Sequence, residues 1–122
     1  MKKVVIIDDE EDFLKEISEI LISHGYEAKP FFSPEQAIKK IKIIQPDIIL
    51  LDFKMEEMSG FEIAEKLSND KETAHIPIIG ITGFYTEREY HLPIKMCGIK
   101  KYLLKPVEPQ ELISEIEKLS KK

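Results

Sequence analysis

Polar residues with catalytic or metal-binding potential collect at the ends of apolar runs in this chain. Five of them stand at or directly after the carboxyl end of such a run: Asp8, Asp9, Asp52, Thr82 and Lys105. The chain has only six aspartates, and three of the six occupy these ends. A random scatter of surface acid therefore explains the pattern poorly.

These residue types suit phosphoryl transfer. Carboxylates packed together repel one another unless a cation neutralises them, and Mg²⁺ prefers oxygen ligands and often bridges a carboxylate to a phosphoryl group. Lys105 supplies a positive charge and Thr82 a hydroxyl for phosphoryl oxygens. One of the aspartates could then be the nucleophile that carries the phosphoryl group as an acyl phosphate.

Two plainer interpretations of the acidic residues stay open at this point. An acid after a strand is often a turn former or a helix cap, and Asp9 or Glu11 could cap the helix that follows. A calcium-binding loop that starts at Asp8 is excluded, because Phe13 stands where such a loop needs glycine.

The hydrophobic pattern predicts alternating strands and helices. Short apolar runs without alternation are typical of strands buried on both faces, and five segments have this character or continue it: 4–7, 26–32, 47–52, 76–82 and 102–104. Pro30 suits an edge strand. Because parallel neighbours need helical crossovers, the alternation indicates an α/β domain with a parallel sheet covered on both faces.

Capping signals place five helices between and after these strands. Gly25 follows the first helix, and Ser33 with Pro34 opens the second. Apolar residues at helical spacing mark the third helix, within 61–67. Thr86 and Glu89 resemble a capping box for a fourth helix, which Pro93 must kink or stop, and the last helix begins at Pro109.

Composition narrows the class of protein. With 122 residues, 43% of them hydrophobic, the chain fits one compact domain, 1–122. The net charge of -5 with interleaved signs argues against a nucleic-acid surface, and no apolar run is long enough for a membrane span. The lone Cys97 agrees with a reducing compartment, so we expect a cytoplasmic protein.

Four motifs in order make the sequence resemble the receiver domains of two-component response regulators. They are Ile6-Ile7-Asp8-Asp9-Glu10, the stretch from Leu50-Leu51-Asp52 to Met58-Ser59-Gly60, Thr82-Gly83, and Tyr102-Leu103-Leu104-Lys105-Pro106. The resemblance spans essentially the whole chain. It implies a flavodoxin-like, doubly wound, five-stranded parallel sheet of order 2-1-3-4-5 with five helices.

The resemblance also implies roles for individual residues. Asp52 would accept a phosphoryl group from a sensor histidine kinase or phosphotransfer protein, with Mg²⁺, or Mn²⁺ in its place, as cofactor. The metal ligands would be Asp9, Asp52 and the Lys54 carbonyl, with Asp8 acting through a water. The phosphoryl oxygens would be held by Thr82, Lys105 and the N–H groups of Lys54 and Gly83, and Lys105-Pro106 would be a cis peptide.

Family members switch by moving the residues that match Thr82 and Tyr102. This remodels the surface formed by the fourth helix, fifth strand and fifth helix, so the resemblance implies a signalling domain with a downstream protein or fused output domain. Such a domain assists its own phosphorylation and dephosphorylation but is no enzyme with a separate substrate. It would bind neither nucleic acid nor membrane directly.

The chain departs from the family pattern at four positions. Glu56 replaces a proline, and Pro93 alters the fourth helix. Lys54 and Phe84 occupy positions that tune phosphoryl lifetime, and we expect Phe84 to shield the acyl phosphate from water.

Two other functions compete with this interpretation. A haloacid-dehalogenase-type phosphatase would need a second aspartate where this chain has Lys54. A scaffold that works without phosphorylation would be expected to lack a site residue, and none is missing.

Overall fold

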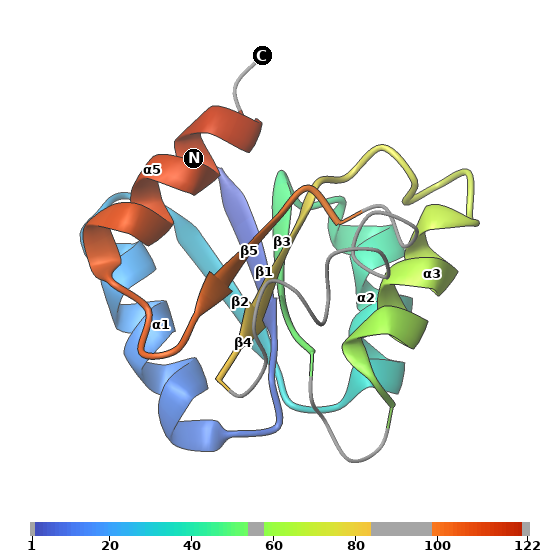
Figure 1. The fold of residues 1–122 in the computed structure, drawn as a ribbon. Helices are drawn as coiled ribbons and strands as arrows, with labels where there is room; N and C mark the ends of the chain where they lie inside the picture. The colour runs from blue at the N-terminus through green and yellow to red at the C-terminus, as the bar shows by residue number, and fades with distance from the viewer. Residues whose placement is uncertain (1, 54–57, 84–98, 121–122) are drawn as a thin grey trace.

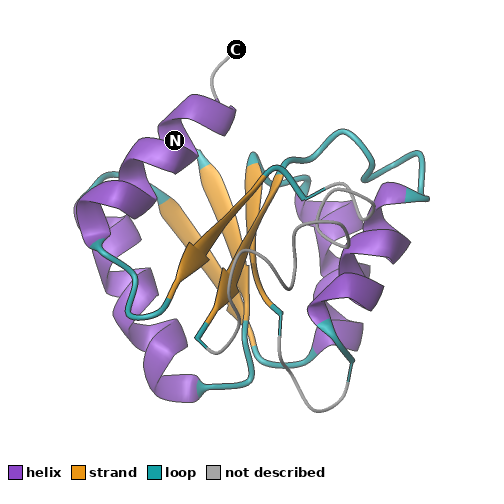
Figure 2. Ribbon diagram, in the orientation of Figure 1, coloured by secondary structure: helices purple, strands orange, loops and turns teal. Residues whose placement is uncertain are grey.

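A five-stranded parallel sheet forms the centre of the protein (Figures 1 and 2). The computed structural model describes residues 2–53, 58–83 and 99–120. The strand order is β2-β1-β3-β4-β5, which confirms the predicted order 2-1-3-4-5. The strands are β1 (Lys3–Ile7), β2 (Glu27–Phe31), β3 (Ile48–Asp52), β4 (Ile78–Thr82) and β5 (Lys101–Leu104).

Helices cover both faces of the sheet, so the fold has three layers (Figure 1). The described helices are α1 (Glu11–Ser23), α2 (Pro34–Ile44), α3 (Gly60–Ser68) and α5 (Pro109–Ser120). Helices α1 and α5 lie on one face, and α2 and α3 lie on the other. The predicted fourth helix, with Thr86, Glu89 and Pro93, falls outside the described residues, as does Cys97.

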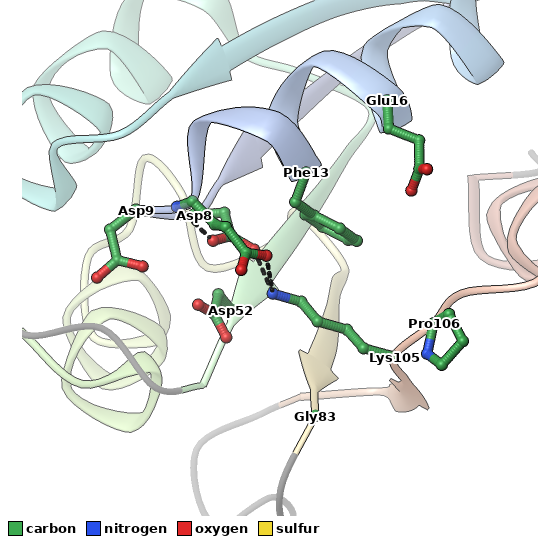
Figure 3. Close-up of a pocket in the computed structure, with 9 residues that line it drawn as sticks. Asp8, Asp9, Phe13, Glu16, Asp52, Gly83, Lys105 and Pro106 are labelled. Carbon is green, nitrogen blue, oxygen red and sulfur yellow. Dashed lines mark hydrogen bonds and ion pairs between the residues drawn. The ribbon is translucent and has the colours of Figure 1, made fainter.

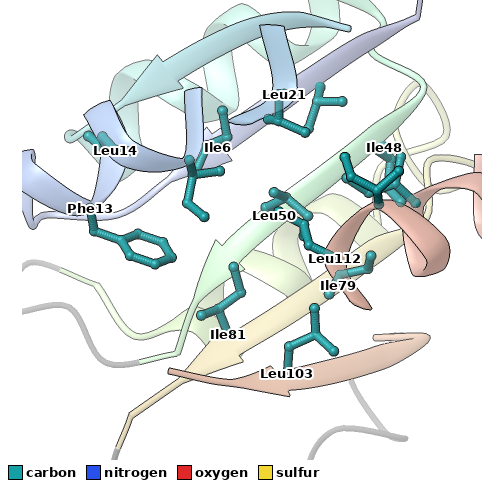
Figure 4. Close-up of a cluster of buried hydrophobic side chains, with 14 residues drawn as sticks. Ile6, Phe13, Leu14, Leu21, Ile48, Leu50, Ile79, Ile81, Leu103 and Leu112 are labelled. Atoms are coloured by element: carbon teal, nitrogen blue, oxygen red, sulfur yellow. The ribbon is translucent and has the colours of Figure 1, made fainter. Parts of the chain in front are cut away.

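The alternation of side chains along each strand divides the core in two. Alternate residues of the central strands, such as Ile6 and Leu50, pack against α1 and α5 (Figure 4). Their neighbours, such as Ile7 and Leu51, pack against α2 and α3. All five residues of β3 and of β4 are buried, which explains why these runs show no alternation in the sequence.

Local sequence signals set most helix ends. Ser33 accepts a hydrogen bond from the N–H of Gln36, with Pro34 in the first turn. Gly25 follows α1 with φ of 88°, a conformation that glycine adopts without steric cost. A capping box between Ser59 and Glu62 opens α3 and was not predicted from the sequence.

The predicted strand limits need small corrections. Strand β2 begins one residue later than expected, at Glu27, and β4 begins at Ile78, after Pro77. Proline has no N–H for the ladder, although the Pro77 carbonyl still accepts from the N–H of Ile49. Pro30 lies in β2, at the sheet edge, as predicted. None of the helices in the described ranges has both the length and the apolar character needed to span a bilayer.

Candidate functional site

The strand register brings the predicted site residues to one edge of the sheet. In the β1–β3 ladder, Asp8 and Asp52 directly follow the last pair, and Asp52 ends β3 in register with Ile81 of β4. Thr82 pairs with Leu104, so Lys105 directly follows the last pair on β5. A cleft of about 500 Å³ opens at this edge, lined by Asp8, Asp9, Glu10, Phe13, Glu16, Asp52, Gly83, Lys105 and Pro106 (Figure 3).

Three carboxylates form the acidic centre of this cleft. Ligand oxygens of Asp8, Asp9 and Asp52 all lie within 4.8 Å of one another. Asp8 is 1% exposed and Asp52 6% exposed, whereas Asp9 lies open to solvent. Oxygen donors that converge from two strand ends, with one open side, suit a hard divalent cation that keeps some of its waters.

Asp8 also forms the turn that starts α1. Its Oδ1 accepts a hydrogen bond of 2.8 Å from the N–H of Glu10, so the plain interpretation as a turn former holds for this residue in addition to its place in the cluster. The residue before α1 is Glu10, and its side chain makes no capping hydrogen bond. The suggestion that Asp9 or Glu11 caps α1 is therefore wrong, because Glu10 holds the cap position and the helix begins at Glu11.

Lys105 reaches into the cleft toward the acidic residues. Its Nζ lies 3.0 Å from Asp8 Oδ2, 3.4 Å from Glu10 Oε1 and 4.2 Å from the centroid of the Phe13 ring. The Lys105 N–H donates to the Thr82 carbonyl at 2.8 Å, which ties the two strand ends together. The Lys105-Pro106 peptide is cis, as the family resemblance predicted.

Burial and charge act in opposite directions on this ion pair. Burial raises the pKa of Asp8, and hydrogen bonds from the Glu10 N–H and Lys105 offset only part of that rise. Burial alone would lower the pKa of Lys105, but its hydrogen bond to Asp8 and the negative charges of Asp8, Asp52 and Glu10 outweigh this and raise the pKa. Lys105 therefore keeps its positive charge at neutral pH.

The residue after Asp52, Phe53, is buried and holds the backbone at Asp52 in place. Phe53 is 2% exposed; its N–H donates to the Ile81 carbonyl, and its carbonyl accepts from the N–H of Gly60, each at 3.0 Å. A Cβ at Gly80 would lie 2.1 Å from Cζ of Phe53, and one at Gly60 would lie 2.7 Å from the Asp52 carbonyl oxygen. Both glycines therefore allow the close approach that fixes Asp52.

This support for Asp52 was not predicted from the sequence. Gly80 interrupts an otherwise apolar strand and Gly60 stands at a helix start, and a glycine in a strand interior is a signal of close backbone approach.

The other predicted site residues lie near the cleft or outside the described ranges. Thr82 is completely buried at the end of β4, and Gly83 lines the cleft beside Lys105. Tyr102 is half-buried against the core on the α2 and α3 face. Lys54, with Glu56 and Phe84, falls outside the described residues, so its predicted ligand and N–H contacts stay predictions.

Comparison with known proteins identifies the family. Residues 4–117 match the response regulator receiver domain, and the chain belongs to this family. It is 31% identical over 116 residues to the polar-differentiation response regulator DivK of Brucella ovis, an alignment that covers 95% of this chain and 94% of that protein.

Solved structures show the same fold. A CheY-like response regulator receiver domain protein from Methanospirillum hungatei superposes with a TM-score of 0.90 at 28% identity, covering 98% of this chain and 94% of that one. The chemotaxis protein CheY4 of Vibrio cholerae superposes with a TM-score of 0.91 at 25% identity, covering 98% of each chain. Like these proteins, the chain has a flavodoxin-like fold and is a two-component signalling domain.

Proposed function

We propose that residues 1–122 form one receiver domain that accepts a phosphoryl group on Asp52. The donor would be a phosphohistidine of a sensor histidine kinase or phosphotransfer protein in the cytoplasm. The observation that carries the proposal is the convergence of Asp52 with Asp8 and Asp9 within 4.8 Å, in a cleft that also holds the Lys105 ammonium.

Asp52 acts as the nucleophile. One of its carboxylate oxygens attacks phosphorus, so an O–P bond forms while the P–N bond of the phosphohistidine breaks. The electron pair of the broken bond stays with the imidazole, which leaves neutral when its other nitrogen is protonated. Low exposure of Asp52 limits access of water to the resulting acyl phosphate.

The surrounding residues balance the charge of the transferred group. Asp9, Asp52 and the Lys54 carbonyl would hold Mg²⁺, or Mn²⁺ in its place, with Asp8 acting through a water. The cation would supply positive charge to the phosphoryl oxygens and thereby favour transfer. Lys105 leaves Asp8 and pairs with another oxygen, while Thr82 and the N–H groups of Lys54 and Gly83 donate to those that remain.

Phosphorylation then biases a two-state surface. Thr82 and Tyr102 lie on the neighbouring strands β4 and β5, and Tyr102 pairs in register with Gly80. Movement of Thr82 toward the phosphoryl group and of Tyr102 inward would remodel the region around β5 and α5 for a downstream protein or fused output domain. The added charge shifts the equilibrium only through contacts that differ between the two states.

Intact-mass measurement tests the central step. The protein is incubated with Mg²⁺ and acetyl phosphate, and wild type is compared with Asp52→Asn. We expect one phosphoryl group on the wild type and none on the variant. The wild type should form no adduct when the Mg²⁺ is chelated before the donor is added. An adduct on both proteins, or on neither when a cognate kinase is also supplied, would refute the assignment of Asp52.

A further inference from the structure

Glu10 lines the mouth of the cleft, with its carboxylate 3.4 Å from the Lys105 ammonium. Among the described residues, Lys105 has two ion-pair partners, Asp8 and Glu10, and both come from the turn between β1 and α1. The Phe13 ring lies on the same side of the ammonium. All three interactions draw Nζ toward α1, and Figure 3 shows Asp8 and Phe13 beside the end of the Lys105 side chain.

The backbone fixes the position of Glu10. The hydrogen bond from its N–H to Asp8 Oδ1 places it directly before α1. Because its carboxylate does not cap the helix, the side chain is available to reach Lys105. Its side chain is 62% exposed, so the pair lies where solvent and salt screen it.

The two partners of Lys105 respond differently when a cation binds to the carboxylate cluster. A cation held by the carboxylate cluster shares the charge of Asp8, which weakens its hold on the lysine. Glu10 lies outside the three-carboxylate cluster and keeps its charge for Lys105. It is then the competitor that the phosphoryl oxygens must displace.

We propose that Glu10 is a positioning residue that restrains Lys105 by an ion pair in the unphosphorylated state and thereby slows phosphorylation of Asp52. This inference rests on the proposed function. Only molecules in which Lys105 is not paired with Glu10 have the lysine ready for the incoming phosphoryl group. The observed rate of phosphorylation is therefore reduced in proportion to the fraction of molecules in which the pair is formed.

Glu16 offers a matched control. It lines the same cleft and carries the same charge, but in the described part of the chain its carboxylate is not an ion-pair partner of Lys105. It lies on the next turn of α1 (Figure 3). A Glu16→Gln change therefore reports the general effect of removing one negative charge from the cleft mouth.

The experiment measures the rate of phosphorylation by phosphoramidate at saturating Mg²⁺, followed by intact mass. We expect Glu10→Gln to raise the rate about two- to fivefold, the range for loss of one partly exposed ion pair. The Mg²⁺ affinity, measured by calorimetry, stays that of the wild type. Glu16→Gln should give a smaller increase, which disappears at high ionic strength.

A Lys105→Ala background separates a restraint on the lysine from other roles of Glu10. There, Glu10→Gln should raise the rate no more than Glu16→Gln does, because the lysine on which Glu10 acts is gone. Glu10→Asp, with a shorter reach, should give an intermediate rate. It also serves as the test variant if Glu10→Gln lacks a cooperative thermal transition.

Three results would overturn the inference while leaving the proposed function intact: a Glu10→Gln rate no higher than wild type, a Glu16→Gln gain equal to that of Glu10→Gln at low ionic strength, or a full Glu10→Gln gain without Lys105. If the wild type forms no adduct with either phosphoramidate or a kinase, the proposed function fails, and this inference fails with it.

Discussion

Replacing Gly80 by alanine would place a methyl group inside the ring of Phe53. An ideal Cβ at Gly80 lies 2.1 Å from Cζ and 2.2 Å from Cε1 of Phe53, whereas non-bonded carbons prefer about 3.5–4.0 Å. The ring is 2% exposed and lies in a densely packed core, so it cannot move aside freely. Overpacking of this kind costs about 1–3 kcal/mol, and the depth of the overlap puts Gly80→Ala at the upper end, about 3 kcal/mol.

A double-mutant cycle tests whether the ring is the cause. Phe53→Ala alone should cost about 3–5 kcal/mol, as expected for loss of a buried aromatic ring. In the double variant the methyl group introduced at position 80 enters space that the ring has left, so the combined cost should fall short of the sum of the single costs by about 2–3 kcal/mol. Urea unfolding followed by circular dichroism measures all four proteins, provided that the m-value is unchanged.

Gly83→Ala is the matched control. A Cβ there would meet Lys105 Cβ at 3.6 Å and Cδ at 3.7 Å, which are ordinary contacts. We expect a change in the free energy of unfolding below about 1 kcal/mol and no coupling to Phe53. Additive single costs in the double variant, or a Gly80→Ala cost no larger than that of Gly83→Ala, would refute the packing argument.

Three further predictions concern other parts of the molecule. Gly60→Ala should destabilise the protein by about 3 kcal/mol and slow adduct formation, because the new Cβ would lie 2.7 Å from the Asp52 carbonyl oxygen. Urea unfolding measures the first effect and intact mass the second, and wild-type values for both would contradict this. Mg²⁺ at about 100 times its Kd should stabilise the wild type by about 2.7 kcal/mol, seen as a rise in Tm, and an equal rise in Asp9→Asn would exclude Asp9 as a ligand. The hydrogen bond from Lys42 lowers the pKa of Asp70 in the folded protein. The ionised Asp70 therefore stabilises the fold at a pH above its pKa in the unfolded chain, and this stabilisation is lost as the pH falls through its lower pKa in the folded protein. Asp70→Asn should therefore lower the urea midpoint at pH 7 and lower it less near pH 3. An equal decrease at the two pH values would refute this.

Much of the fold could be predicted because its signals are local. The unbroken apolar runs that end at Ile7 and Asp52 indicate strands covered on both faces, and Ser33 with Pro34 indicates a helix start. These features depend on neighbours in the sequence, so one chain suffices to identify them. The strand order, in contrast, came from the family resemblance and not from periodicity.

Contacts between distant segments were harder to predict. No local pattern shows that Lys105 pairs with Glu10, since 95 positions separate them. The same holds for Gly80 and the Phe53 ring, which meet because β3 and β4 are neighbours. The alternative that Asp9 or Glu11 caps α1 was wrong for a related reason: Asp8 serves both the turn and the acidic cluster, and composition cannot divide these roles.

The charges of the cleft impose an order on the proposed reaction. Five carboxylates line it against a single described ammonium, that of Lys105: Asp8, Asp9, Glu10, Glu16 and Asp52. A phosphoryl donor is itself anionic, so the field at the mouth opposes its approach while the carboxylates remain uncompensated. A divalent cation close to Asp52 would offset two of these negative charges. In the proposed reaction we therefore expect cation binding to precede productive binding of the donor.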